Sequence, residues 1–172
     1  MSLNLLKSKI ILKKISPKNI SLNYIKWMND PEVVQFTEQK NKKHTRKNIG
    51  LFLKKTNEDI FSEIYGIFYE KILIGTVKIG KINNIHKTAE ISYIIGNKKF
   101  WNKGIATFVV KKICDYIFGK LKLKKIIAGT YSVAISSQKI LIKNGFKLEG
   151  ILKKQILFKN KRIDLHFYGR LK

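Results

Sequence analysis

Residues 93–107 read YIIGNKKFWNKGIAT, and this segment indicates the fold more clearly than any other part of the chain. An apolar run typical of a strand, residues 89–95, ends at Gly96, and a short basic loop follows. From Gly104 onward the pattern becomes helical and continues over residues 107–118. A strand, a basic loop with small residues and a helix N-terminus form an anion site, because the amides of the first helical turn and the helix dipole favour negative charge.

The loop lacks the two common phosphate-binding signatures, Gly-x-x-x-x-Gly-Lys-Ser/Thr and Gly-x-Gly-x-x-Gly. It resembles instead the acetyl-CoA pyrophosphate loop of the GNAT N-acetyltransferase superfamily, whose pattern is Gln/Arg-x-x-Gly-x-Gly/Ala. Residues 101–106 occupy that pattern, with Trp101 in place of the usual Gln/Arg. The Phe-Trp-x-Lys-Gly-x-Ala-Thr form is similar to the branch that contains ribosomal-protein N-terminal acetyltransferases and amino-sugar acetyltransferases.

A second segment, residues 134–146, resembles the later frame of the same superfamily, Asn-x-x-Ser/Ala followed by a short helix that ends in Gly-Phe. Ser137 stands in the Ser/Ala position and Lys143 in a common Lys position. Two residues depart from the frame. Ala134 replaces the Asn that typically contacts the cofactor, and Leu141 stands where many members place a tyrosine that acts as general acid.

The hydrophobic pattern along the chain predicts an α+β fold with a mostly antiparallel central sheet of about seven strands flanked by helices. Thr45 is the expected N-cap of one helix, and Ser136 or Ser137 is the expected N-cap of another. Gly119 is an expected C-terminal cap, whereas Asn29-Asp30-Pro31 and Asn144-Gly145 should each end a helix. The order of elements matches the GNAT fold. Strands are expected over residues 10–15, 64–69, 73–82, 88–95, 125–131, 146–158 and 162–171, and helices over 19–28, 45–55, 107–118 and from Ser136 or Ser137 to 143.

The length of 172 residues predicts a single domain, residues 1–172, with one core. No apolar run approaches the roughly 18 residues that a membrane span needs, so we expect no membrane partner. The N-terminal segment shows no secretory signal pattern. Cys114 is the single cysteine, which excludes an internal disulfide and fits a cytoplasmic location.

The net charge of +25 allows two interpretations. One is a polyanionic partner such as nucleic acid, the ribosome or an anionic membrane. The other is the base composition of an AT-rich genome, because 33 of the 36 basic residues are lysine and lie scattered along the chain. We favour the second, since clusters of arginine with aromatic residues are missing. Nucleic-acid binding is then expected to be non-specific only.

The resemblance implies acetyl-CoA as co-substrate and direct transfer of the acetyl group in a ternary complex. It also implies that main-chain groups at the end of the strand pair with the pantetheine arm, and that loop amides bind the pyrophosphate. Lys98, Lys99 and Lys103 would add long-range charge. The predicted cofactor-binding residues are Tyr93, Ile94, Ile95, Trp101, Asn102, Lys103, Gly104, Ile105, Ala106, Thr107, Ser137 and Lys143.

Attack by an amine needs a base, because an amine of ordinary pKa is mostly protonated at neutral pH. Glu90 is the predicted base, as a carboxylate in an otherwise apolar strand whose partial burial would suit it for proton transfer. The alternative is a strand glutamate paired with a lysine on the solvent face. Tyr93 is a predicted proton donor to the leaving thiolate, and Tyr131 is an alternative donor. No metal is expected, because neither His86 nor His166 has a second ligand at metal-binding spacing.

The segment WMNDPEV, residues 27–33, resembles a segment of the same acetyltransferase branch and is expected on the acceptor side. The predicted acceptor-binding residues are Trp27, Asn29, Asp30, Glu32, Phe36 and His44. The alternative is that Trp27 belongs to the core and that Asn29 and Asp30 end a helix.

The first predicted acceptor is the amine of a small molecule such as a nucleotide-linked amino sugar, and the second is a protein N-terminus, including a ribosomal one. A third interpretation is a non-catalytic module that binds CoA or nucleic acid. The resemblance also implies a homodimer, although no interface pattern is readable in the sequence.

Overall fold

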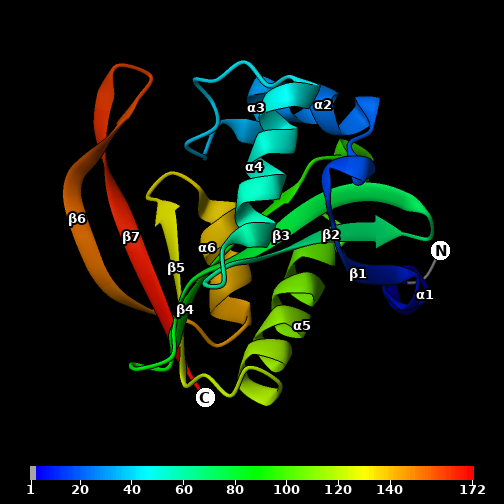
Figure 1. Cartoon of the computed structure of the whole chain (residues 1–172). Helices are drawn as coiled ribbons and strands as arrows, with labels where there is room; N and C mark the ends of the chain where they lie inside the picture. The colour runs from blue at the N-terminus through cyan, green and yellow to red at the C-terminus, as the bar shows by residue number, and fades with distance from the viewer. Residues whose placement is uncertain (1–2) are drawn as a thin grey trace.

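The computed structural model describes residues 3–172 and contains a seven-stranded sheet with helices on both faces (Figure 1). The strand order is β1-β2-β3-β4-β5-β7-β6. Neighbouring strands are antiparallel except for β4 and β5, which are parallel. The strands are β1 (Ile10–Lys14), β2 (Glu63–Tyr69), β3 (Ile72–Asn83), β4 (Thr88–Ile95), β5 (Lys125–Tyr131), β6 (Lys147–Phe158) and β7 (Lys161–Leu171). The predicted α+β class with a mostly antiparallel sheet is confirmed.

Six α-helices and two short 3₁₀ turns accompany the sheet in the described part of the chain. They are α1 (Leu3–Ser8), η1 (Pro17–Asn19), α2 (Leu22–Met28), α3 (Pro31–Val34), α4 (Arg46–Glu58), η2 (Lys98–Phe100), α5 (Ile105–Gly119) and α6 (Ile135–Lys143).

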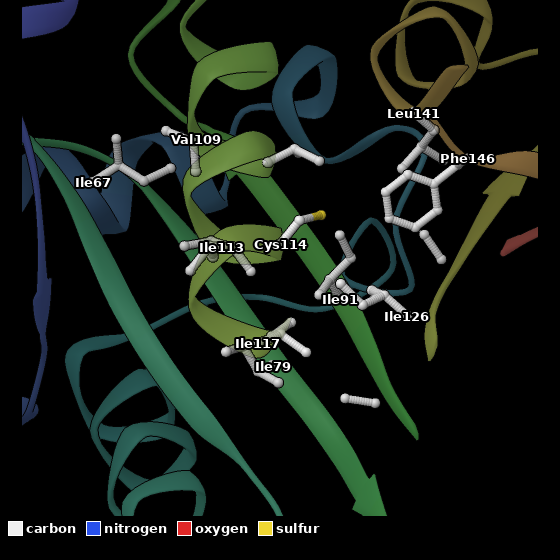
Figure 2. Close-up of a cluster of buried hydrophobic side chains, with 14 of the residues drawn as sticks. Ile67, Ile79, Ile91, Val109, Ile113, Cys114, Ile117, Ile126, Leu141 and Phe146 are labelled. Carbon is white, nitrogen blue, oxygen red and sulfur yellow. The ribbon is translucent and has the colours of Figure 1, made fainter. Parts of the chain in front are cut away.

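The larger part of the core lies between the sheet and α5 (Figure 2). Val109, Ile113 and Ile117 recur on one face of α5 at helical spacing, and they pack against strand residues such as Ile79 and Ile91. These side chains are at most 5% exposed, so replacing one of the α5 isoleucines by alanine is expected to destabilise the protein by about 2–5 kcal/mol.

A second, smaller core lies on the opposite face of the sheet, under α2 and α4. Trp27 of α2 and Leu53 of α4 are buried there against Ile64 of β2. The two faces of the sheet therefore carry different layers, with α5 and α6 on one side and α2 and α4 on the other.

The sheet changes character at the junction of β4 and β5. Their parallel pairing comprises three residue pairs, from Thr88 opposite Lys125 to Glu90 opposite Ile127. Beyond these pairs, residues 91–95 of β4 and 128–131 of β5 have no register with each other, and we call these unpaired ends the β4–β5 opening. On its other side, β5 stays paired with β7 as far as residue 131.

All seven predicted strands agree with the structure to within one residue at each end, but several helix ends differ. The helix predicted from residue 19 starts at Leu22, because Ser21 caps it by accepting a hydrogen bond from the Tyr24 amide at 3.1 Å. Helices α1 and α3 were not predicted. Pro31, interpreted as a helix breaker, is the first residue of α3, where a missing N–H costs nothing.

Two predicted caps were wrong. Gly119 is the last residue of α5 rather than its cap, and the left-handed residue that turns the chain is Lys122, with φ 56°. Helix α6 starts at Ile135 with Ala134 as N-cap, so Ser137 already lies in its first turn. The predicted stop at Asn144 and Gly145 is confirmed, with Gly145 in the left-handed conformation at φ 79°.

Candidate functional site

The N-terminus of α5 has no side-chain cap. Its N-cap is Gly104 at φ 65°, a left-handed conformation that glycine adopts without a steric penalty. The first amide with an intrahelical acceptor is that of Phe108, which donates to the Gly104 carbonyl at 3.1 Å. The amides of Ile105, Ala106 and Thr107 therefore point out of the helix, and no acidic residue lies in the first turn. This arrangement fits a phosphate group.

The end of β4 presents main-chain groups toward β5. The Gly96 amide donates to the Ile74 carbonyl at 2.9 Å, so these two residues form a directly hydrogen-bonded pair of the β3–β4 ladder. Such pairs alternate along an antiparallel ladder, so Ile94 bonds to β3, whereas the main-chain groups of Tyr93 and Ile95 face the β4–β5 opening. An extended ligand with amide groups could pair with this edge like an added strand.

Trp101 and Gly96 fix the loop that connects β4 to α5. The indole N–H of Trp101 donates to the Ile95 carbonyl at 2.6 Å. A Cβ atom on Gly96 would overlap the indole ring of Trp27, so α2 can pack here only against glycine. The polar atom of Trp101 is thus used inside the protein, where it closes the loop onto the strand end.

Helix α6 contacts both the end of β4 and the start of α5. The hydroxyl of Tyr93 lies 3.0 Å from Ser137 Oγ, which joins β4 to the first turn of α6. Burial raises the pKa of Tyr93 to about 12, and the Ser137 contact opposes this shift. At the other end of α6, Asn144 Nδ2 donates to the Thr107 carbonyl at 3.2 Å, which brings exposed Lys143 beside the start of α5. The structure therefore brings together the predicted cofactor residues from three segments, which are the end of β4, residues 101–107 and helix α6.

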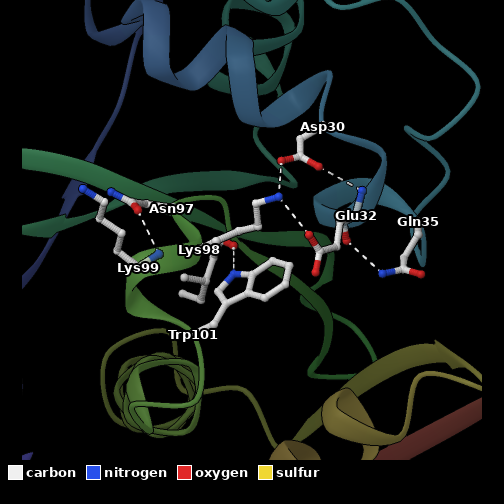
Figure 3. A network of polar contacts seen from close by, with 8 residues as sticks. Asp30, Glu32, Gln35, Asn97, Lys98, Lys99 and Trp101 are labelled. Atoms are coloured by element: carbon white, nitrogen blue, oxygen red, sulfur yellow. Dashed lines mark hydrogen bonds and ion pairs between the residues drawn. The ribbon is translucent and has the colours of Figure 1, made fainter.

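Lys98 connects this site to the predicted acceptor side (Figure 3). Its Nζ lies 2.7 Å from Asp30 Oδ2 and 2.8 Å from Glu32 Oε2. The Asp30 contact is the largest cause that raises the pKa of Lys98, and it lowers the pKa of Asp30 in turn. The predicted role of Lys98 in long-range attraction of phosphate is weakened, because two carboxylates neutralise its charge.

Several predicted acceptor residues have structural contacts. Trp27 is 6% exposed and belongs to the α2–α4 core, as the alternative interpretation expected. Asn29 ends α2, and its side chain bonds to the His44 main chain in both directions, at 2.7 Å and 2.9 Å. The His44 ring is buried, and its Nε2 lies 3.1 Å from the Gln39 carbonyl. These contacts hold the segment between α3 and α4 in place.

Glu90 lies on the face of β4 that looks toward α2 and α4. Its Oε1 is 2.8 Å from Lys81 Nζ, and its side chain is 38% exposed. The ion pair matches the alternative interpretation, whereas the partial burial of the side chain matches the one expected for a base.

A further cluster was not predicted from the sequence. The hydroxyl of Tyr131, at the end of β5, donates to Glu38 Oε1 at 2.6 Å. Phe36, predicted on the acceptor side, stacks on Phe158 of β6 with ring centroids 5.6 Å apart. Lys40 Nζ lies 5.0 Å from the Tyr131 ring centroid and 5.2 Å from that of Phe158. Tyr131 and Glu38 are 93 positions apart, so no local pattern could have joined them.

A cavity of about 340 Å³ lies beside this cluster, between the α3–α4 segment and the tip of the β6–β7 hairpin. It is lined by Pro31, Gln35, Lys40, Asn41, Leu157, Phe158, Lys159 and Asn160.

Two kinds of feature are absent from the described residues. No helix among them is both long and apolar enough to cross a membrane. Residues 3–172 also contain no group of three or more side chains suited to a metal ion.

Comparison with known proteins agrees with this geometry. The family model for the acetyltransferase (GNAT) domain matches residues 9–147. The uncharacterized N-acetyltransferase YoaA of Bacillus subtilis (strain 168) is 27% identical over 170 residues, which cover 95% of this chain and 94% of the relative. The ribosomal-protein-serine acetyltransferase of Escherichia coli (strain K12) is 25% identical over 144 residues, covering 84% of this chain and 76% of the relative.

A solved structure shares the fold over nearly the full length. The spermidine N-acetyltransferase of Vibrio cholerae, in complex with CoA and spermine, superposes with a TM-score of 0.85 at 22% identity. The superposition covers 95% of this chain and 96% of that one.

Proposed function

The chain belongs to the acetyltransferase (GNAT) family, and we propose that it transfers the acetyl group of acetyl-CoA to a primary amine by direct attack in a ternary complex. It is an N-acetyltransferase at the level of its family. The observation that carries the proposal is the uncapped N-terminus of α5 beside the β4–β5 opening. The acceptor, the roles of individual residues, the single-domain organisation and a cytoplasmic location are parts of the proposal.

The donor site uses main-chain groups. The amides of Ile105, Ala106 and Thr107 bind the pyrophosphate, and the main-chain groups of Tyr93 pair with the pantetheine arm together with the Ile95 amide. Bound acetyl-CoA supplies the acetyl group as a thioester. One edge N–H stabilises the negative charge that develops on the carbonyl oxygen during attack.

The acceptor approaches from the face of the sheet that carries α2 and α4, which is opposite to the face of α5 and α6. Glu90 remains the proposed base, although it lies four residues before Ile94, about 13 Å along the strand, and must act through water. Tyr93 faces the α6 side, and its pKa of about 12 keeps the phenol protonated at neutral pH. It can therefore donate a hydrogen bond to the departing thiolate.

The first proposed acceptor is the amine of a small molecule, such as a nucleotide-linked amino sugar. The similarity to the ribosomal-protein-serine acetyltransferase supports a second candidate, a protein N-terminus. Direct attack without an acyl-enzyme agrees with the burial of Cys114, which is 0% exposed and whose thiol pKa burial raises to about 11.

Thermal unfolding with and without acetyl-CoA tests the donor site, followed by CoA release with amino sugars, polyamines and N-terminal peptides. Saturating acetyl-CoA should raise the melting temperature by roughly 5 to 10 °C, because it binds only the folded state. Absence of a shift at millimolar acetyl-CoA would refute the donor site. Binding of acetyl-CoA without release for any amine would favour a non-catalytic CoA-binding module.

The role of Glu90 is tested separately. Glu90→Gln should lower turnover at least about tenfold at neutral pH if this carboxylate accepts the proton. Lys81→Gln is the control, because it removes the ion pair and keeps the carboxylate. Equal losses in both variants would assign a structural role to Glu90.

A further inference from the structure

Nearly all carboxylates of this protein are neutralised by lysine. The chain has 11 acidic residues, and nine of them lie within 3.8 Å of a lysine Nζ. Across residues 3–172, the two exceptions are Glu38 and Asp59. Asp59 Oδ1 closes a turn by accepting the Phe61 amide at 2.9 Å. Glu38 is thus a carboxylate without a lysine partner in a protein of net charge +25.

Glu38 is held in place by Tyr131, whose hydroxyl donates to Glu38 Oε1 at 2.6 Å. Burial is the main cause that raises the pKa of Tyr131, and the Glu38 carboxylate adds to the shift. The phenol therefore stays a hydrogen-bond donor at neutral pH. A carboxylate has about four acceptor positions, so Glu38 retains capacity for a further donor.

The register of the sheet places this pair beside the proposed point of transfer. Glu90 pairs with Ile127, so Tyr131 is level with Ile94 across the β4–β5 opening. The side chain of Tyr131 alternates with those of Ile126 and Ala128, which pack on the α5 side. Tyr131 therefore points to the face of α2 and α4, from which the acceptor approaches.

The neighbouring aromatic rings already accommodate an ammonium group. Lys40 Nζ lies 5.0 Å from the ring centroid of Tyr131 and 5.2 Å from that of Phe158, within cation–π range. Lys40 donates its hydrogen bond to the Leu157 carbonyl at 3.1 Å and forms no ion pair with Glu38. The 340 Å³ cavity lined by Lys40 and Phe158 gives space for the rest of an acceptor.

We propose that Glu38, positioned by Tyr131, binds the protonated amine of the acceptor at the β4–β5 opening. This assignment rests on the proposed acetyltransferase function. Glu38 is the binding residue, and Tyr131 is a positioning residue that acts through it. The ligand class is a primary ammonium group, which a carboxylate recognises by a charge-assisted hydrogen bond.

Steady-state kinetics with three amine probes test the proposal: glucosamine, spermine and a hexapeptide with a free N-terminal serine. Glu38→Gln should raise the acceptor KM about tenfold and leave the acetyl-CoA KM within about twofold, because a charge-assisted hydrogen bond is lost only to the acceptor. Tyr131→Phe should raise the acceptor KM about threefold with little change in kcat, since Glu38 is less well positioned. Glu58→Gln is the matched control on α4 and should change neither constant.

The pH dependence of the acceptor KM distinguishes a binding role of Glu38 from a purely structural one. The wild-type acceptor KM should rise as the amine loses its proton, whereas in Glu38→Gln it should stay nearly constant. An unchanged acceptor KM in Glu38→Gln, with wild-type activity intact, would overturn this assignment alone. A wild type that acetylates none of the three probes would overturn the proposed function and this assignment together. An unchanged acetyl-CoA KM shows that the variant is folded.

Discussion

The N-termini of α4 and α5 have opposite designs. At α4, Thr45 Oγ1 accepts the Asn48 amide at 3.2 Å, and Asn48 Oδ1 accepts the Thr45 amide at 2.8 Å. This reciprocal capping box satisfies helix-end donors with side chains of the protein itself. At α5 the cap is Gly104, which offers no side chain, and the first-turn amides remain available. The first-turn amides of α5 have no acceptor among residues 3–172 and lie beside the β4–β5 opening, so this helix end is suited to binding a ligand.

The largest expected effect comes from closing the open end of α5. In Gly104→Asp, the new carboxylate competes for the first-turn amides and repels phosphate. The Kd for acetyl-CoA should rise about 100-fold, as expected for the loss of two charge-assisted hydrogen bonds. Isothermal titration calorimetry measures this change.

Gly104→Asn is the matched control, because asparagine has the same shape and also tolerates the left-handed conformation. It should weaken binding about tenfold or less, since it cannot repel phosphate. Equal affinities in the two variants would show that charge at the α5 N-terminus does not matter for binding.

The loop that carries α5 can also be broken at Gly96. In Gly96→Ala, the new methyl group would overlap the indole of Trp27, so the unfolding free energy should fall by about 1–3 kcal/mol. Gly119→Ala is the control, because nothing lies within 4 Å of the new Cβ. That control should stabilise the protein by about 0.5–1 kcal/mol. Urea unfolding followed by circular dichroism distinguishes the two.

Removing the cap of α4 tests whether the N-terminus of this helix has only a structural role. Thr45→Ala should lower the unfolding free energy by about 1 kcal/mol, because the Asn48 amide loses its acceptor. The affinity for acetyl-CoA should stay unchanged, since α4 lies on the other face of the sheet. A marked loss of affinity would contradict the division between a structural and a ligand-binding helix end.

The smallest expected effect concerns the contact of Lys98 with Asp30. Because Lys98 lowers the pKa of Asp30, the contact stabilises the fold above the ordinary aspartate pKa of 3.8 and is lost as pH falls through and below that value. Asp30→Asn should therefore be slightly less stable than wild type at neutral pH. The difference in melting temperature should close in acid, and a constant difference would exclude this contact as its cause.

Strong local patterns made much of the fold predictable. The alternating strands, the Thr45 cap and the stop at Asn144-Gly145 are signals carried by a few adjacent residues. The family, read from residues 101–106 and 134–146, is confirmed as well. Helix α3 was missed because it has only four residues and begins at a proline, which also marks turns.

The site was harder to predict, because its contacts join residues far apart in the chain. The sequence places Ser137 where a cap is plausible, but the fold brings it to Tyr93. The pairing of Lys98 with Asp30 and that of Tyr131 with Glu38 depend on how the layers meet, which no periodicity encodes. Glu90 shows what the sequence could not decide, because its position in the strand was compatible with both a partly buried base and a lysine-paired residue on the solvent face.

Amide chemical shifts measured by nuclear magnetic resonance during an acetyl-CoA titration test the central claim most directly. The amide protons of Ile105, Ala106 and Thr107 should move downfield as they begin to donate to phosphate. The Asn48 amide in the first turn of α4 should stay unchanged, because Thr45 Oγ1 already accepts its hydrogen bond. Shifts confined to other segments, with residues 105–107 unmoved, would contradict the assignment of the α5 N-terminus as the donor site.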